Sequence, residues 1–401
     1  MRNRIMTSPS PSKRSANCAF SARPRILMAL EWYDAKLHEG IAHYAKEAGW
    51  ILDASMARMN TLPEHWEGDG VITLLHEENS NYLSFIKALD LPTVGIGYTL
   101  QDHYPVLLGD HAKTGALGAE HFLERNFKNY AFVFFDNSIL EKERCAGFEG
   151  ALGASGNPYS LQKWKNKTRS KTRSYRDVRD WLVKLIEAAP KPLAIMAQND
   201  DSAILILYAC IYAGISIPEE VAVLGADNNP LICDFAPIPL SSVDCDQHRL
   251  GYMTGRQLND IMNGGKVPEN PVLCPPKEVV LRRSTDIPAI ENLTIAKAVR
   301  FIWDHFEEPI NVDTIIALTG MSRSLVYHEF DQAIGGSIAR EITRCRIDKA
   351  KKLLEETDLS ISEITPACGF TGIVSFCRAF ARETGCTATA HRQKTRDLQL
   401  Q

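Results

Sequence analysis

The feature that most constrains the fold of this chain is a change in its hydrophobic pattern near Asp286. Over residues 25–284, short β-branched or aliphatic runs alternate with helical stretches, and this alternation predicts βαβ units built around parallel sheets. From residue 295 onward, apolar residues recur at the helical period. We therefore predict an α/β domain at residues 25–285 and an all-α domain at residues 286–401.

The first of these domains is long for a single sheet. Roughly 260 residues with this many strand candidates exceed one doubly wound fold, so we expect two lobes with a cleft between them. Residues 1–24 combine Ser and Pro with a few basic residues and lack the apolar core of a secretory signal, which predicts a disordered leader and a cytoplasmic protein. The strand candidates are residues 26–30, 51–55, 71–75, 93–96, 106–108, 130–135, 193–197, 221–225 and 279–281.

The all-α domain contains an approximate internal repeat. Residues 322–330 match residues 372–380, and a glycine follows each copy after four residues, at Gly335 and Gly385. A short helical pattern that ends in glycine precedes each copy, so the layout is helix, turn, helix, twice over, and predicts two helix-turn-helix units. We expect one continuous helix between them, at residues 337–355. At about 1.5 Å per residue it would span roughly 28 Å, near the length of one turn of B-DNA.

An ordered series of short motifs runs through residues 295–396. They include Asn311-Val-Asp313, Gly320-Met-Ser-Arg-Ser324, Arg346-Ile-Asp-Lys-Ala350, Leu359-Ser-Ile-Ser-Glu-Ile364, Cys368-Gly-Phe370 and Phe376-Cys-Arg-Ala-Phe380. With these motifs the segment resembles the DNA-binding domain of the AraC/XylS family of transcription factors, and the resemblance implies that the second helix of each unit reads double-stranded DNA. Carried over position by position, it assigns DNA contacts to Arg323, Ser324, Tyr327 and His328 in the first unit and to Val374, Cys377 and Arg378 in the second.

Arg378 is the strongest of these candidates on chemical grounds. A guanidinium fork can bond the O6 and N7 atoms of guanine together, and such a pair contributes about 1–3 kcal/mol of discrimination. Val374 and Cys377 offer only apolar contact, for example to a thymine methyl group. A contact to the phosphate backbone is the alternative for Arg378 and for Tyr327.

Net charge gives no support to a DNA-binding function. The 45 Lys and Arg residues against 49 Asp and Glu residues give a formal net charge of −4, so the chain has no general basic footprint. The basic residues nevertheless gather late, where Arg378, Arg382, Arg392, Lys394 and Arg396 outnumber the acidic side chains. This segregation agrees with the motifs, although a charge run is by itself usually a solvated face.

Residues 25–285 also carry motifs in a fixed order. Among them are Arg144-Cys-Ala-Gly-Phe148, Asn199-Asp-Asp201, Val223-Leu-Gly-Ala-Asp-Asn228 and Leu240-Ser-Ser-Val243. In these motifs the segment resembles the ligand-binding domain of the LacI/GalR family, which has a two-lobed, periplasmic-binding-protein-like fold. Members of that family begin with a DNA-binding headpiece, whereas residues 1–24 are too short and too rich in Ser and Pro to form one. DNA recognition is therefore expected at the other end of the chain.

Polar side chains stand beyond the carboxyl ends of the predicted strands, where ligands bind in open α/β sheets. Carboxylates, amides and a guanidinium can each make two hydrogen bonds to vicinal hydroxyls, and an aromatic ring can lie against a sugar, so the set indicates a neutral polyol site. The family resemblance favours Arg144, Asn199 and Asp227, while for the other positions a helix cap or a surface loop is the alternative. The candidates for ligand binding are Tyr33, Asp34, Arg144, Asn199, Asp200, Asp227 and Asn228.

Together the two resemblances imply a sugar-responsive transcription regulator, with the ligand between the lobes of the first domain and operator DNA on the second. We expect an activator of pentose utilisation genes that binds xylose, forms a homodimer and contacts RNA polymerase. Within the same architecture, a repressor or a sensor of a different small ligand is the alternative.

An enzyme is the competing class of function. The sequence has no complete dinucleotide fingerprint, zinc-protease motif, nucleophile elbow or phosphate-binding loop, so we expect neither catalysis nor a cofactor. No two cysteines stand at C-x-x-C spacing, which argues against a metal site, and no run of about 18 apolar residues could span a membrane.

Overall fold

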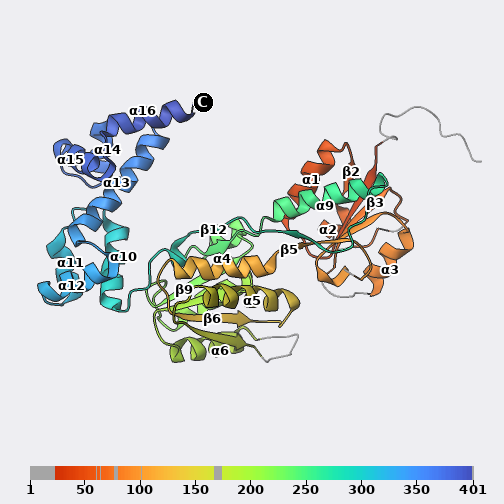
Figure 1. The fold of residues 1–401 in the computed structure, drawn as a ribbon, viewed down its shortest axis with the longest axis horizontal. Coiled ribbons are helices and arrows are strands. Elements are labelled where there is room, and N and C mark those ends of the chain that lie inside the picture. The colour runs from red at the N-terminus through yellow and green to blue at the C-terminus, as the bar shows by residue number, and fades with distance from the viewer. Residues whose placement is uncertain are drawn as a thin grey trace, which may run out of the picture. The chain divides into compact units, whose positions relative to one another are not determined.

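The computed structural model describes residues 23–59, 61–63, 65–75, 80–100, 102–166 and 174–399 (Figure 1). Residues 1–22 of the predicted leader lie outside them. The chain divides into two compact units, Met1–Asp110 with Cys245–Lys277 and His111–Asp244 with Glu278–Gln401, and each unit is described by itself. Among the described helices, none has both the length and the apolar character that crossing a bilayer requires.

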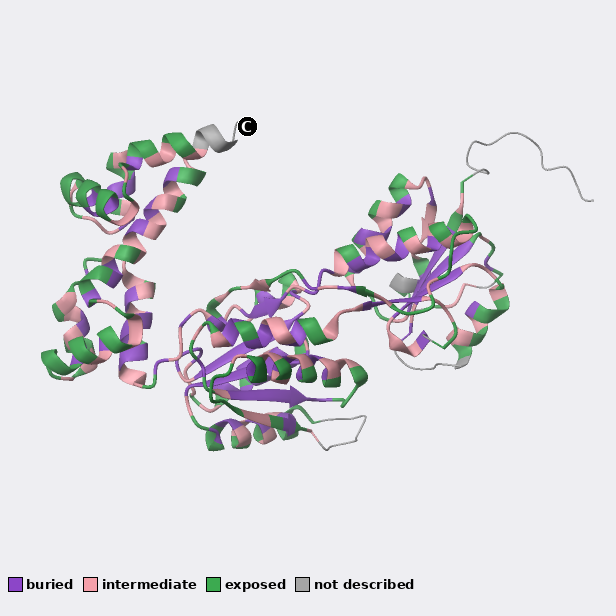
Figure 2. Cartoon of the chain, viewed as in Figure 1, coloured by how far each residue is buried: buried purple, intermediate pink, exposed green. Residues whose placement is uncertain are grey.

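The first unit is built on a six-stranded parallel sheet in the order β11-β5-β4-β3-β1-β2. One face packs on α1 and α9 and the other on α2 and α3, so the strands are buried on both sides and read as apolar runs (Figure 2). The strands are β1 (Arg25–Leu30), β2 (Ile51–Asp53), β3 (Gly70–Leu74), β4 (Thr93–Ile96), β5 (Val106–Gly109) and β11 (Val272–Cys274). The helices are α1 (Ala35–Glu47), α2 (Ser55–Met59), α3 (Ser80–Leu89), the 3₁₀ turn η1 (Tyr98–Leu100) and α9 (Gln247–Met262).

The second unit contains a matching sheet in the order β12-β10-β9-β8-β6-β7, which is parallel except for β12. The prediction of two parallel-sheet α/β lobes is therefore confirmed. The strands are β6 (Asn129–Phe134), β7 (Ser160–Lys165), β8 (Leu193–Ala197), β9 (Val221–Ala226), β10 (Ser241–Val243) and β12 (Val279–Val280). The helices are α4 (His111–Leu123), α5 (Ile139–Ala154), α6 (Tyr175–Ala188), α7 (Asp200–Tyr212), α8 (Pro230–Cys233) and the 3₁₀ turn η2 (Arg283–Thr285).

The rest of the second unit is helical and confirms the two predicted helix-turn-helix units. The long helix α13 begins after the cap residue Ser337 and supplies apolar side chains to two cores, Ile338 and Ile342 to the first and Ile347 and Leu354 to the second. The two helix-turn-helix units therefore share one continuous helix, α13. The helices are α10 (Leu293–His305), α11 (Val312–Thr319), α12 (Arg323–Ile334), α13 (Ile338–Glu356), α14 (Ile361–Ala367), α15 (Ile373–Thr384) and α16 (Ala388–Gln399).

Helix pairs in both α/β lobes cross at glycines. In the second unit a Cβ atom on Gly147 of α5 would lie 1.8 Å from the carbonyl oxygen of Ala112, and one on Gly115 of α4 would lie 1.8 Å from that of Arg144. In the first unit a Cβ on Gly40 of α1 would lie 1.9 Å from the carbonyl oxygen of His248 on α9. Real side chains never approach backbone so closely, so these helices pack at a separation that only glycine permits.

The crossing of α4 and α5 can be tested with two alanine substitutions on one helix. Gly147→Ala should lower the free energy of unfolding by about 1–3 kcal/mol, because the new methyl group must push the two backbones apart. Gly150 lies on the same helix with nothing within 4 Å of a Cβ atom, so Gly150→Ala should be neutral or stabilising by up to about 1 kcal/mol. Thermal unfolding of the full chain measures both, and equal melting temperatures for the two variants would contradict the close crossing.

Candidate functional site

A buried arginine organises the polar cluster at the carboxyl ends of β8 and β9. Arg144, carried by α5, is 2% exposed. Its Nη2 donates to Asp227 Oδ1 at 3.0 Å, its Nη1 donates to the carbonyl oxygen of Gln198, and its Nε donates to His111 Nδ1 at 3.4 Å. The guanidinium thus joins the ends of two strands and the start of α4.

The charge on Arg144 also sets the state of His111. Burial and the neighbouring guanidinium lower the pKa of His111 to about 3, so the imidazole is neutral at physiological pH and accepts the hydrogen bond from Arg144. Asp227 has a backbone φ of +100° and Asn228 one of +52°, a positive-φ conformation that Asp and Asn tolerate better than most residues.

Two further candidates lie at the start of α7. Asn199 caps the helix, because its Oδ1 accepts the Ser202 N–H at 2.9 Å. Asp200 is 2% exposed and accepts the Ser242 hydroxyl at 2.5 Å on one oxygen and the Asn229 N–H at 2.8 Å on the other. Burial, followed by the charge of Asp227, raises the pKa of Asp200 to about 7. These contacts give Asp200 a role in bracing the loop that follows β9.

Asn228 is held on both ends of its amide. Its Nδ2 donates to Asp244 Oδ2 at 3.1 Å, and its Oδ1 accepts from Arg282 Nη1 at 3.0 Å. The structure therefore gathers five of the predicted ligand-binding residues in the second unit: Arg144, Asn199, Asp200, Asp227 and Asn228.

The other two predicted residues lie in the first unit, at the start of α1. Asp34 is the N-cap of that helix and accepts the Leu37 N–H at 2.7 Å. The Tyr33 ring is 45% exposed and its hydroxyl lies 3.1 Å from His38 Nδ1. Ligand binding by either residue stays a prediction.

Sequence reasoning missed two members of the cluster around Arg144. His111 is the first residue of α4, and Gln198 directly precedes Asn199. Gln198 contributes a backbone carbonyl oxygen, for which side-chain identity gives no signal. His111 could have been found only from its position at the first turn of a helix beside a strand end.

The second helices of the two helix-turn-helix units each present a polar or mixed face opposite a buried one. In α15, Val374, Cys377 and Arg378 are exposed at helical spacing, while Phe376 and Phe380 are buried. Fifty residues earlier, α12 repeats the pattern with exposed Ser324, Tyr327 and His328 over buried Val326 and Phe330. All of the predicted DNA contacts on these two helices are thus exposed.

Several exposed side chains of α12 contact one another or a neighbouring helix. Arg323 forms an exposed ion pair with Asp313 of α11, and its Nη1 lies 3.4 Å from the Tyr327 hydroxyl. His328 Nε2 lies 3.1 Å from Gln332 Nε2. The side chains at the start of α12 are therefore oriented by one another, which restricts the geometry that a DNA phosphate or base would meet.

An ion-pair network that the sequence did not reveal joins α10 to the sheet of the second unit. Arg300 Nε donates to Glu219 Oε1 at 3.0 Å, and its Nη atoms bond Asp286. Arg300 and Glu219 are only 9% and 8% exposed. Removing one partner of a buried pair typically costs about 3–5 kcal/mol, because the other charge is left buried without a partner.

Comparisons with known proteins match both parts of the chain. A periplasmic binding protein-like domain matches residues 119–285, and a helix-turn-helix domain matches residues 315–394. The xylose operon regulatory protein of Escherichia coli (strain K12) is 28% identical over 405 residues, which cover 95% of this chain and 100% of that protein. The protein of the same name from Haemophilus influenzae is 27% identical over 90% of this chain and 95% of its own length. The solved structure of a xylose-binding transcription activator, 24% identical, matches 93% of this chain and 99% of its own with a TM-score of 0.69.

The buried carboxyl group of Asp200 gives a testable pH dependence. Its pKa is raised in the folded protein, so the stability it contributes is fully present below the unfolded value near 3.8 and is lost as the pH rises through about 7. Asp200→Asn removes the titration, so its stability relative to the unaltered chain should rise by up to about 3 kcal/mol between pH 5 and pH 8. Melting temperatures of both proteins at the two pH values measure this change. A difference between them that does not vary with pH would contradict a buried, titrating Asp200.

Proposed function

We propose that this chain activates sugar utilisation genes in response to a pentose, xylose. It combines a periplasmic-binding-protein-like domain with a helix-turn-helix domain, and it is similar over most of its length to xylose operon regulatory proteins. The sensing domain comprises residues 25–285 and the DNA-binding domain residues 286–401. The observation that carries the proposal is the buried Arg144 held against Asp227 at the carboxyl end of a parallel sheet.

The chemistry of that pair suits a neutral sugar. A guanidinium donates and a carboxylate accepts, so together they can bond two vicinal hydroxyls of a pyranose ring. Asp227 is 21% exposed whereas Arg144 is 2% exposed, so the carboxylate is the member of the pair that a ligand meets first. Asn199 and Asn228 add amide groups at the same edge of the sheet, and His111 adds a neutral imidazole.

The proposed response runs from the sugar to the DNA-binding helices through the second unit. Strand β9 ends just before Asp227. Glu219, the partner of Arg300 on α10, lies two residues before the first residue of the strand. A ligand that shifts the loop after β9 therefore acts on this strand, and the segment before the other end of β9 contacts α10 of the helical domain through Glu219 and Arg300. Homodimerisation, contact with RNA polymerase and a cytoplasmic location belong to the same proposal.

Sugar binding can be tested by ligand-induced stabilisation of the full chain. Xylose at a hundredfold excess over its dissociation constant should stabilise the protein by about 2.7 kcal/mol, seen as a rise in melting temperature. Asp227→Asn should remove most of that rise, because the amide has no charge and its one acceptor oxygen is needed by Arg144. Asp180→Asn, an exposed carboxylate on α6, should leave it unchanged. If no pentose or hexose raises the melting temperature, the sugar-sensing proposal fails; if a different sugar does, the ligand is reassigned.

DNA recognition can be tested with two arginines of α15. Arg378→Ala should reduce discrimination at one base pair of the operator by about 1–3 kcal/mol, if the guanidinium bonds a guanine. Arg382 lies one turn further along the helix and contacts Glu383, so Arg382→Ala should change affinity without changing sequence preference. Gel-shift titrations against operator variants measure both. An unchanged preference in Arg378→Ala would assign that side chain to a phosphate.

A further inference from the structure

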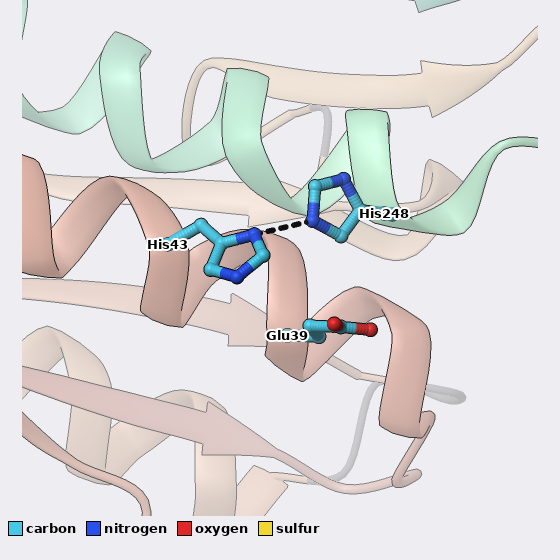
Figure 3. A group of neighbouring side chains, drawn as sticks. All are labelled: Glu39, His43 and His248. Carbon is cyan, nitrogen blue, oxygen red and sulfur yellow. Dashed lines mark hydrogen bonds between the residues drawn. The ribbon is translucent and has the colours of Figure 1, made fainter. Parts of the chain in front are cut away.

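Three metal-ligating side chains that the proposed function does not use lie together in the first unit. Glu39 and His43 lie one turn apart on α1, and His248 lies in the first turn of α9 (Figure 3). Their ligand atoms all lie within 4.8 Å of one another. In the part of the chain that the structure describes, this is the one group of three or more His, Cys, Asp or Glu side chains placed so closely. Glu39 and His43 are exposed and His248 is half-buried, so solvent ions can reach them.

The backbone holds these side chains close before any ion arrives. Gly40 and Gly251 allow α1 and α9 to pack at backbone contact, and the carbonyl oxygen of His248 itself lies against Gly40. Glu39 and His43 stand at i and i+4, the spacing that places two side chains on one face of a helix. As a result His43 Nδ1 lies 2.7 Å from His248 Nε2, and the two rings meet edge to face.

From this arrangement we propose a zinc site formed by Glu39, His43 and His248. Two imidazoles and one carboxylate are the ligand types that Zn²⁺ prefers, and they leave a fourth tetrahedral position for water. At metal–nitrogen distances of about 2.0–2.1 Å, two nitrogens on one tetrahedral ion stand roughly 3.3 Å apart, so the two ring nitrogens need to separate by about 0.6 Å from their present 2.7 Å. Ca²⁺ and Mg²⁺ are disfavoured because they select oxygen ligands.

An ion at this position would join segments that are far apart in the chain. His43 and His248 are separated by 205 residues, and α9 belongs to the segment Cys245–Lys277, which returns to the first unit before β12 completes the second sheet. Zn²⁺ would therefore fasten α9 to α1 and stabilise the folded first unit by mass action.

The test is zinc titration of the metal-stripped full chain by calorimetry, together with its melting temperature in zinc. The unaltered chain should bind one equivalent at this site and melt at a higher temperature. His43→Gln, His248→Gln and Glu39→Gln should each weaken that binding by more than about tenfold and remove the rise in melting temperature.

A matched control separates this site from zinc bound elsewhere, including at cysteines. His305 and Glu308 form an exposed His–Glu pair at 2.7 Å with only two ligands, so His305→Gln should bind zinc as the unaltered chain does. Glu39 and His43 are exposed and His248 is half-buried, so circular dichroism checks that each variant is folded. If the unaltered chain takes up no zinc at micromolar concentration, or if the three variants bind as it does, the proposal is wrong.

Discussion

The close crossing of paired helices at glycine is the constraint on which both clusters of polar side chains depend. In the second unit, Arg144 places its own carbonyl oxygen against Gly115, and its side chain then reaches Asp227. In the first unit, His248 lies in the same way against Gly40, which brings its ring to His43. A side chain at either glycine would separate the helices and carry the functional groups apart. Gly115 and Gly40 thus determine both how closely the helices pack and where the polar side chains lie.

Strand β9 connects the proposed sugar site with the helical domain. Asp227 follows its carboxyl end and Glu219 precedes its amino end, where Arg300 of α10 is held in a buried ion pair. A strand in the middle of a sheet is hydrogen-bonded on both sides and moves as one body. Asp227 and the Arg300 partner Glu219 therefore flank one strand, and this strand is the path by which our proposal couples the sugar site to the helical domain.

The sequence predicted the features that depend on local periodicity and motif order. It did not predict the short strands or the contacts between residues far apart in the chain. The two lobes and the helix at residues 338–356 follow from apolar spacing. Strand β7 was missed because only Trp164 of its six residues is buried. Strand β10 was missed because two of its three residues are serines, and β11 because only Cys274 of its three residues is buried. The bonds of Arg144 to a backbone carbonyl and to His111, and the proximity of His43 to His248, depend on tertiary packing that no spacing rule expresses.

The two helix-turn-helix units keep their interiors alike and their outer faces different. Phe330 and Phe380 occupy equivalent buried positions, whereas Tyr327 and His328 correspond to Cys377 and Arg378 on the surface. Because both units are built on α13, their order and direction along that helix are fixed. On the proposed assignment of the DNA contacts, one subunit reads a sequence that differs from its own reverse complement. A single chain then determines its own orientation on the operator DNA, and so its orientation relative to the promoter.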